Sequence, residues 1–205
     1  MKDFNWAKKE PKHEEKPKSI EDKESRPSFV EVVENRIYFY SRIETEKILQ
    51  LNRNILSMGI NLQREATIQN REPANIYLHL QSYGGSIFAG MAGMDEIIKS
   101  VVPVYTMIDG CCASAATFLS VCGKRRFINR HAYMLIHQLS SFMWGKYEDF
   151  KDEMQNLDKI MAMIKQVYKE YTKIPMSKLD GILKHDLWFD ADQCKEYGLV
   201  DEIIV

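Results

Sequence analysis

Residues 110–116 read Gly-Cys-Cys-Ala-Ser-Ala-Ala. They follow a β-branched, apolar run from Val101 to Ile108 and open a short helical pattern from Ala115 to Val121, which places Ser114 at a strand-to-helix turn. A serine at such a turn has small neighbours, and the positive end of the helix dipole lies beneath its hydroxyl. Further along the chain, His137 ends a second apolar, strand-like run. A serine and a histidine placed in this way favour nucleophilic acyl transfer.

Strand-like and helix-like segments alternate through the rest of the chain, which predicts an α/β fold with a mostly parallel sheet covered by helices. Strands are expected at Phe29–Tyr40, Asn75–Leu80, Val101–Ile108, Phe127–Ile128, Ala132–Ile136 and Leu199–Val205. Helices are expected at Thr45–Arg64, Ile87–Ser100, Ser114–Val121, Tyr147–Tyr171, Leu179–Leu183 and Ala191–Tyr197. In the longest helix, apolar residues recur at steps of three and four, so this stripe is either ordinary core or a contact surface.

Composition limits the function classes. Of the 205 residues, 45% are hydrophobic and 28% are charged, which suits one globular domain. The formal net charge of −1 gives no support for a nucleic-acid partner or a membrane surface. No apolar stretch approaches the roughly 20 residues that span a bilayer. The four cysteines lack metal-site spacing, so we expect reduced thiols in a cytoplasmic protein, with neither a metal nor another cofactor.

The first 27 residues differ from the rest of the chain. They are rich in Lys and Glu and contain almost no aliphatic residues. Such a segment cannot bury enough apolar surface to order itself. We therefore expect a disordered, charged tail over residues 1–27 and a folded domain over residues 28–205.

A histidine base needs a third group that fixes its tautomer. The candidates after His137 are Asp149, Asp152, Asp158, Asp180, Asp186, Asp190, Asp192 and Asp201. Asp186 stands beside bulky apolar residues in Lys-His-Asp-Leu-Trp-Phe, which could hold it partly buried.

An oxyanion also needs backbone N–H donors. The amide of Ala115, directly after the serine, is one candidate. The Gly84–Gly85 turn offers another, because glycine lets the backbone approach a substrate closely. A plain turn at the entry to a helix explains the two glycines equally well.

Six short segments stand in a particular order along residues 38–205. They read Gln-Ser-Tyr-Gly-Gly-Ser-Ile, Gly-Cys-Cys-Ala-Ser-Ala-Ala-Thr-Phe-Leu, Gly-Lys-Arg-Arg-Phe, Met-Leu-Ile-His-Gln, His-Asp-Leu-Trp-Phe-Asp-Ala and Glu-Tyr-Gly-Leu-Val-Asp. Together they resemble the proteolytic subunit of the Clp protease. The resemblance implies the Clp protease/crotonase-like fold, built from repeated β-β-α units with a protruding handle helix in a region of about 140–172. The chain order Ser, His, Asp also differs from that of the α/β-hydrolases.

The resemblance implies roles for individual residues. Ser114 would be the nucleophile, His137 the general base and Asp186 its orienting partner. The amides of Gly85 and Ala115 would form the oxyanion hole. The substrate would lie as an added strand beside Ser140, Ser141, Phe142 and Met143.

The resemblance also implies partners. It predicts a serine endopeptidase that hydrolyses unfolded proteins or peptides inside a homo-oligomeric chamber of two stacked heptameric rings, in some cases with an AAA+ unfoldase. His79 replaces an aromatic residue of the family's docking pocket for the ATPase, so a specialised processing endopeptidase without a standard unfoldase is an alternative. A crotonase-like acyl-CoA binder and a non-catalytic ring subunit are others; the joint presence of Ser114, His137 and Asp186 argues against both.

Overall fold

The computed structural model describes residues 29–142 and 144–204. The predicted tail over residues 1–27 lies outside them. The strands are β1 (Phe29–Val33), β2 (Arg36–Tyr40), β3 (Ile76–Ser82), β4 (Val104–Ala113), β5 (Arg125–Asn129), β6 (Tyr133–Leu135), β7 (Trp188–Phe189) and β8 (Glu202–Ile204). The helices are α1 (Thr45–Gln69), α2 (Ile87–Lys99), α3 (Ala116–Val121), α4 (Tyr147–Tyr171), α5 (Met176–Leu183) and α6 (Ala191–Glu196).

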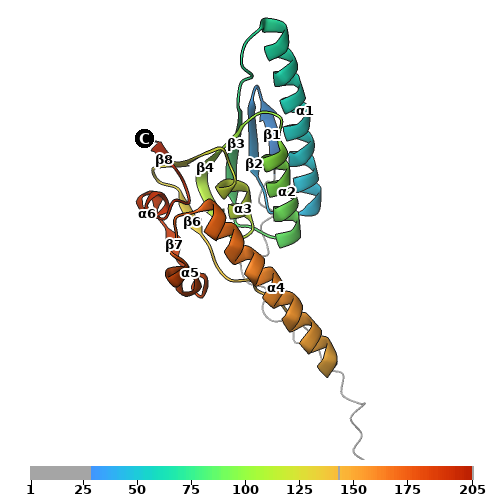
Figure 1. Cartoon of the computed structure of the whole chain (residues 1–205), viewed down its shortest axis with the longest axis vertical. Helices are drawn as coiled ribbons and strands as arrows, with labels where there is room; N and C mark the ends of the chain where they lie inside the picture. Colours follow the sequence, from blue (N-terminus) through green and yellow to red (C-terminus); the bar gives the residue numbers. More distant parts are fainter. Residues whose placement is uncertain (1–28, 143, 205) are drawn as a thin grey trace, which may run out of the picture.

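The strands form one eight-stranded sheet with the order β1-β2-β3-β4-β5-β8 (Figure 1). Strand β6 pairs with the end of β4, and β7 pairs with β6. The pairings β2–β3, β3–β4, β4–β5, β4–β6 and β5–β8 are parallel, whereas β1–β2 and β6–β7 are antiparallel. The prediction of a mostly parallel sheet with helical connections is therefore confirmed.

The core lies between the sheet and its covering helices. Ile76, Leu78 and Leu80 alternate along β3 and are fully buried, and Leu51 and Ile55 of α1 join the same cluster. Alternate burial along a strand is the pattern of a sheet with one face against a core. The buried apolar residues thus lie on the strand predicted at Asn75–Leu80 and on the helix predicted at Thr45–Arg64.

The first predicted strand is wrong in one respect. Residues 29–40 form two antiparallel strands, joined at Glu34 and Asn35. Glu34 has a φ of 54°, in the left-handed region that reverses the chain. Asn35 donates a side-chain hydrogen bond to the carbonyl of Asn75, 2.8 Å away, which fixes the turn next to β3. A Glu-Asn pair is a weaker turn signal than Asn-Gly, so the alternating pattern looked continuous.

Other differences concern the ends of elements. Helix α1 continues to Gln69 and ends at Asn70, whose φ of 49° provides a left-handed cap. Strand β4 begins later than predicted and continues to Ala113. The two-residue strand β7 was not predicted, because so short a segment has no visible period.

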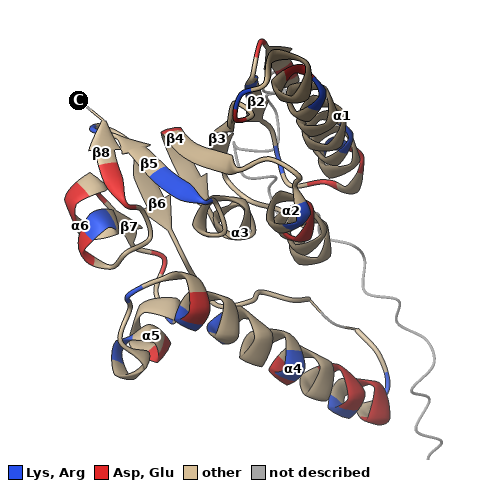
Figure 2. Ribbon diagram, turned by 45° about the horizontal axis from the view of Figure 1, so that its top comes forward, with Lys and Arg blue, Asp and Glu red and all other residues tan. Residues whose placement is uncertain are grey.

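Helix α4 has the bounds that its periodicity predicts, Tyr147–Tyr171. Its C-terminal part packs on the body through the buried side chains of Ile164 and Tyr168, whereas Phe150 and Met154 are 42% and 55% exposed. The N-terminal part projects away from the sheet (Figure 1), and charged residues of both signs gather toward that end (Figure 2). The apolar stripe is therefore core at one end and uncovered surface at the other. Among the described helices, none combines the length and the apolar character that crossing a membrane requires.

Candidate active site

Ser114 lies at the edge of the sheet, between the end of β4 at Ala113 and the start of α3 at Ala116. Its φ is 55°, a left-handed conformation that costs a non-glycine residue roughly 1–3 kcal/mol. The Ser114 N–H donates a 2.8 Å hydrogen bond to the carbonyl of Leu135, at the end of β6. The turn is therefore held on the neighbouring strand with the serine side chain at its tip.

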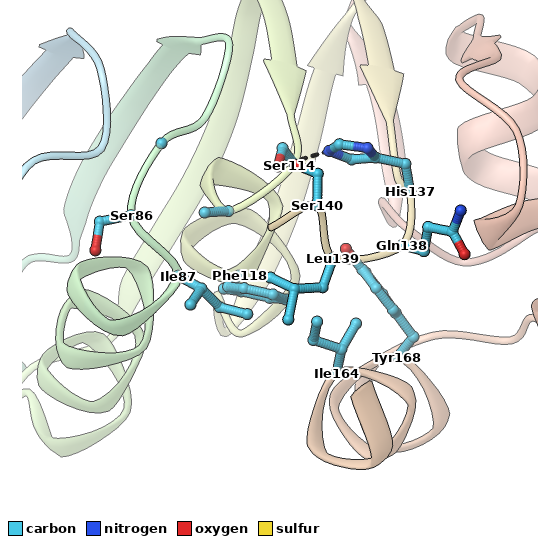
Figure 3. A pocket seen from close by; sticks show the side chains of 12 residues that line it. Ser86, Ile87, Ser114, Phe118, His137, Gln138, Leu139, Ser140, Ile164 and Tyr168 are labelled. Carbon is cyan, nitrogen blue, oxygen red and sulfur yellow. Dashed lines mark hydrogen bonds between the residues drawn. The ribbon is translucent and has the colours of Figure 1, made fainter. Parts of the chain in front are cut away.

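His137 reaches Ser114 because β4 and β6 are parallel neighbours whose carboxyl ends meet at one edge. Ala113 pairs with Leu135. Ser114, one residue after the end of β4, and His137, two residues after the end of β6, therefore lie close together. The His137 Nε2 atom is 2.8 Å from the Ser114 Oγ atom, and Figure 3 shows the two side chains pointing toward each other.

Asp186 comes to the same place through β7. Trp188 pairs antiparallel with Leu135, so the residue two positions before Trp188 lies beside the residue two positions after Leu135. The Asp186 Oδ1 atom is 3.1 Å from the His137 Nδ1 atom. This is an ion-pair distance. In the tautomer with its proton on Nδ1, which faces the carboxylate, Nε2 accepts the hydrogen of the serine hydroxyl. The Asp186 side chain is 76% exposed and that of His137 is 24% exposed.

The Gly84–Gly85 turn lies directly behind the serine. Gly84 has a φ of 93°, and a Cβ atom there would be 2.7 Å from the Ser114 Cβ atom. Gly85 has a φ of 151°, and its Cβ atom would be 2.4 Å from the carbonyl oxygen of Ile43. Ile43 holds the turn from the other side: its N–H donates to the Gly84 carbonyl at 2.9 Å, and its carbonyl accepts from the Ser86 N–H at 2.8 Å. Only glycine fits between these two supports.

Gly85 and Ala115 line a pocket that opens beside Ser114. Within the described part of the chain, no hydrogen-bond acceptor pairs with the N–H of either residue. The Ala115 N–H precedes the first turn of α3, where helix N–H groups have no partner within the helix. Both amides are thus available to an oxyanion bound at the serine.

The pocket has a volume of about 300 Å³. His137 and Ser114 stand at one end, and the rest of the lining combines the polar residues Ser86, Gln138 and Ser140 with apolar side chains from several elements (Figure 3). These apolar residues are Ile87, Phe118, Leu139, Ile164 and Tyr168. The sequence assigned none of them to a site; Ile164 and Tyr168 belong to the apolar stripe of α4, which was expected to be either core or a contact surface.

The predicted substrate-binding segment is placed only in part. Ser140 lines the pocket. Ser141 instead donates a 3.4 Å hydrogen bond to Glu153 on α4, and Phe142 is 92% exposed. Met143 lies outside the described residues. The segment thus leads from the pocket toward α4.

The buried cysteine beside the nucleophile turn is not suited to act as a nucleophile. Cys112 is fully buried next to the turn, and burial raises the pKa of its thiol well above the usual value, which keeps it protonated and unreactive. Among residues 29–142 and 144–204, no three His, Cys, Asp or Glu side chains form a group that could hold a metal ion.

Comparison with known proteins places this chain in a family. The Clp protease family model matches residues 32–205. The chain belongs to the Clp protease family. It is 30% identical to the ATP-dependent Clp protease proteolytic subunit 1 of Chlamydia pneumoniae over 179 residues, which cover 85% of this chain and 89% of that relative. It is 29% identical to the ATP-dependent Clp protease proteolytic subunit of Chlorella vulgaris over 174 residues, 81% of this chain and 85% of that relative.

Membership in the Clp protease family confirms the resemblance predicted from the six segments and the fold class. It also makes this chain a serine-type endopeptidase. What family membership leaves open is which residues of this chain do the chemistry.

Proposed function

We propose that this chain is the proteolytic subunit of a compartmentalised Clp-type protease, with Ser114 as nucleophile, His137 as general base and Asp186 as its orienting partner. The observation that carries the proposal is the continuous contact from Ser114 Oγ to His137 Nε2, at 2.8 Å, and from His137 Nδ1 to Asp186 Oδ1, at 3.1 Å. A nucleophile, a base and an orienting group within hydrogen-bond reach are the requirement for covalent acyl transfer.

The reaction follows from these positions. His137 Nε2 accepts the hydroxyl proton while Ser114 Oγ attacks the carbonyl carbon of a peptide bond. The N–H groups of Gly85 and Ala115 hold the oxyanion of the tetrahedral intermediate. The intermediate collapses when His137 donates its proton to the leaving amine, and an acyl-enzyme ester on Ser114 remains. Water, deprotonated by His137, then hydrolyses the ester and regenerates the serine.

The proposed assembly is a homo-oligomer of two stacked heptameric rings, with unfolded proteins or peptides as substrates. The uncovered apolar residues Phe150 and Met154 on the projecting part of α4 support a contact with another subunit. Because both relatives are named as ATP-dependent, we include an AAA+ unfoldase as a proposed partner. The cytoplasm is the proposed compartment: no disulfide joins the four cysteines, all of which lie in the described part.

One observation favours the alternative of a processing endopeptidase that works without a standard unfoldase. His79, where the family's docking pocket has an aromatic residue, is part of a polar cluster on the sheet. Its Nδ1 atom is 3.0 Å from Asp109, and its Nε2 atom is 3.0 Å from Arg36. The Tyr38 ring stacks on His79, with ring centroids 4.5 Å apart. The charged and hydrogen-bonding groups of the cluster nevertheless make it a poorer site for an apolar docking loop than aromatic side chains alone. Degradation of a stably folded, tagged substrate with a candidate ATPase distinguishes the two functions.

The proposed nucleophile is tested by labelling with a fluorophosphonate probe. The wild-type chain is expected to be labelled, and Ser114→Ala is expected to lose the label completely, because the probe reacts with the activated serine oxygen. Size-exclusion mass measurement on both samples shows whether the particle is assembled. Equal labelling of the wild type and Ser114→Ala would place the reactive oxygen elsewhere. An assembled wild-type particle without label would oppose the proposed triad.

The pocket predicts which peptide bonds are cleaved. Five apolar side chains line the pocket of about 300 Å³ next to the serine, together with the polar residues Ser86, Gln138 and Ser140. Because the apolar residues are the larger ones, we expect the residue before the scissile bond to be a medium-sized or large apolar one. A Leu or Met there should raise kcat/KM over Ala by about 10- to 200-fold, the range for a small change in apolar fit. A panel of fluorogenic peptides that differ only at this residue measures the effect.

The variant for this prediction is Ile164→Ala, which shortens an apolar side chain of the pocket lining and changes no triad residue. It should lower kcat/KM for the Leu peptide more than for the Ala peptide. If wild type prefers Asp or Lys at the varied position, the pocket is not the site that receives this residue.

A further inference from the structure

Two buried hydroxyl groups connect helix α4 to the nucleophile turn. Thr117, in the first turn of α3, donates from Oγ1 to the carbonyl oxygen of Ser114 at 2.6 Å. The same Oγ1 atom is 2.7 Å from the hydroxyl of Tyr168 on α4. Thr117 is fully buried and Tyr168 is 1% exposed. Water therefore cannot substitute for either contact without entering the core.

The direction of the hydrogen bonds follows from counting hydrogens. A carbonyl oxygen cannot donate, so the single hydroxyl hydrogen of Thr117 goes to Ser114. Tyr168 must then donate its own hydrogen to Thr117. Burial raises the pKa of the Tyr168 phenol, which keeps that hydrogen in place. The chain of donors thus runs from Tyr168 to Thr117 and from Thr117 to the carbonyl of Ser114.

The Ser114 carbonyl belongs to the same peptide unit as the Ala115 N–H, which is a proposed oxyanion donor. The carbonyl accepts a second hydrogen bond from the N–H of Thr117, at 3.0 Å. A peptide plane fixed at its oxygen is also fixed at its hydrogen, because the unit is rigid. Hydrogen bonds in sequence polarise one another, so donation to the carbonyl strengthens the N–H as a donor.

We propose that Tyr168 is a positioning residue for the peptidase reaction, which acts through Thr117 to orient and polarise the Ser114–Ala115 peptide. This inference rests on the proposed function of Ser114. It assigns to α4 a role beyond packing and subunit contact, because the helix supplies the first donor of the chain that ends at the oxyanion hole.

A pure packing role makes a different prediction. Tyr168 also lines the pocket and contacts Phe118, with ring centroids 6.1 Å apart. Tyr168→Phe keeps the ring and removes only the hydroxyl, so packing and substrate binding should be preserved. A positioning role predicts a lower kcat with an unchanged KM, whereas a role in the pocket alone predicts a change in KM.

The experiment compares five variants with the wild type, all as assembled protein, on one fluorogenic peptide. Tyr168→Phe and Thr117→Val should each lower kcat by about 3- to 10-fold, the effect of one hydrogen bond of ordinary strength, with KM unchanged. Thr117→Ser keeps the hydroxyl and should stay within about 2-fold of wild type. Combining Tyr168→Phe with Thr117→Val should cost no more than Thr117→Val alone, because both changes interrupt the same chain.

Tyr171→Phe is the matched control, since it removes a tyrosine hydroxyl from the same helix outside the pocket, and it should have wild-type kinetics. Thermal melting and size-exclusion mass identify any variant that fails to assemble; Thr117→Val, which changes no residue of α4, then carries the test. Three outcomes would overturn this inference without affecting the proposed function. They are losses of kcat that multiply in the double variant, a change confined to KM, and wild-type kinetics of Tyr168→Phe. A wild-type protein that the fluorophosphonate probe does not label would instead overturn the proposed function.

Discussion

Replacing Ser114 with alanine is expected to lower kcat for peptide hydrolysis by about 10⁶-fold, and His137→Ala should have an effect of the same size. In the proposed mechanism Ser114 Oγ forms the covalent bond to the acyl group, and His137 Nε2, 2.8 Å away, accepts its proton. Without either group the acyl-enzyme cannot form. The measurement is kcat at saturating peptide concentration, with enzyme in large excess for the slow variants.

The two residues should also act as one unit. The double variant Ser114→Ala/His137→Ala should be no slower than either single variant, because the remaining rate comes from the oxyanion hole and from binding alone. KM should change little in all three. Losses that multiply in the double variant would mean that the two side chains act in separate steps. His185→Ala, next to Asp186 in the sequence, is the control for loss of a nearby imidazole.

Much of this site could be predicted because its parts are local in sequence. Ser114 stands where an apolar strand pattern changes to a helical one, and His137 stands where another strand pattern ends. The parallel pairing of β4 with β6 then brings the ends of the two strands together. A parallel sheet places the carboxyl ends of neighbouring strands at one edge, so two local signals are sufficient to place both residues.

Asp186 shows where reasoning from residues alone stops. Eight aspartates follow His137 in the chain and could serve as its orienting group. The one local signal, the bulky apolar neighbours of Asp186, predicted partial burial, and this was wrong, because the side chain is 76% exposed. Only the antiparallel pairing of Leu135 with Trp188 brings Asp186 beside His137, and a two-residue strand has no period to reveal it. The resemblance to a known family, not the residue pattern, selected Asp186.

The link between Thr117 and Tyr168 could not be predicted for a related reason. Threonine in a short apolar helix and tyrosine in an amphipathic helix both fit ordinary packing patterns. Their hydroxyls meet only because the end of α4 packs against α3, as the 2.7 Å contact shows. Contacts between helices far apart in the sequence depend on tertiary packing. Periodicity predicts which face of a helix is buried, but it does not predict the residues that this face will contact.

Gly85→Ala is expected to lower kcat by about 10²- to 10³-fold, the effect of losing one oxyanion donor. The added Cβ atom would be 2.4 Å from the carbonyl oxygen of Ile43, in a backbone with a φ of 151°. That oxygen also accepts the hydrogen bond from the Ser86 N–H that holds the turn. The clash can be relieved only if the turn moves away from Ile43, and the Gly85 N–H then leaves its place beside Ser114.

Gly85→Ala should also lower the free energy of unfolding by about 1–3 kcal/mol, the cost of holding a non-glycine residue in a strained backbone conformation. Gly181→Ala is the matched control: Gly181 lies within α5, and no atom is within 4 Å of an added Cβ atom. Alanine there should raise stability by up to about 1 kcal/mol, because it favours the helix over the unfolded chain. Thermal melting and kcat are measured for both variants. A Gly85→Ala enzyme that kept wild-type kcat despite a lowered melting temperature would show that the turn supports the fold but supplies no donor to the oxyanion. The second amide would then have to come from another residue.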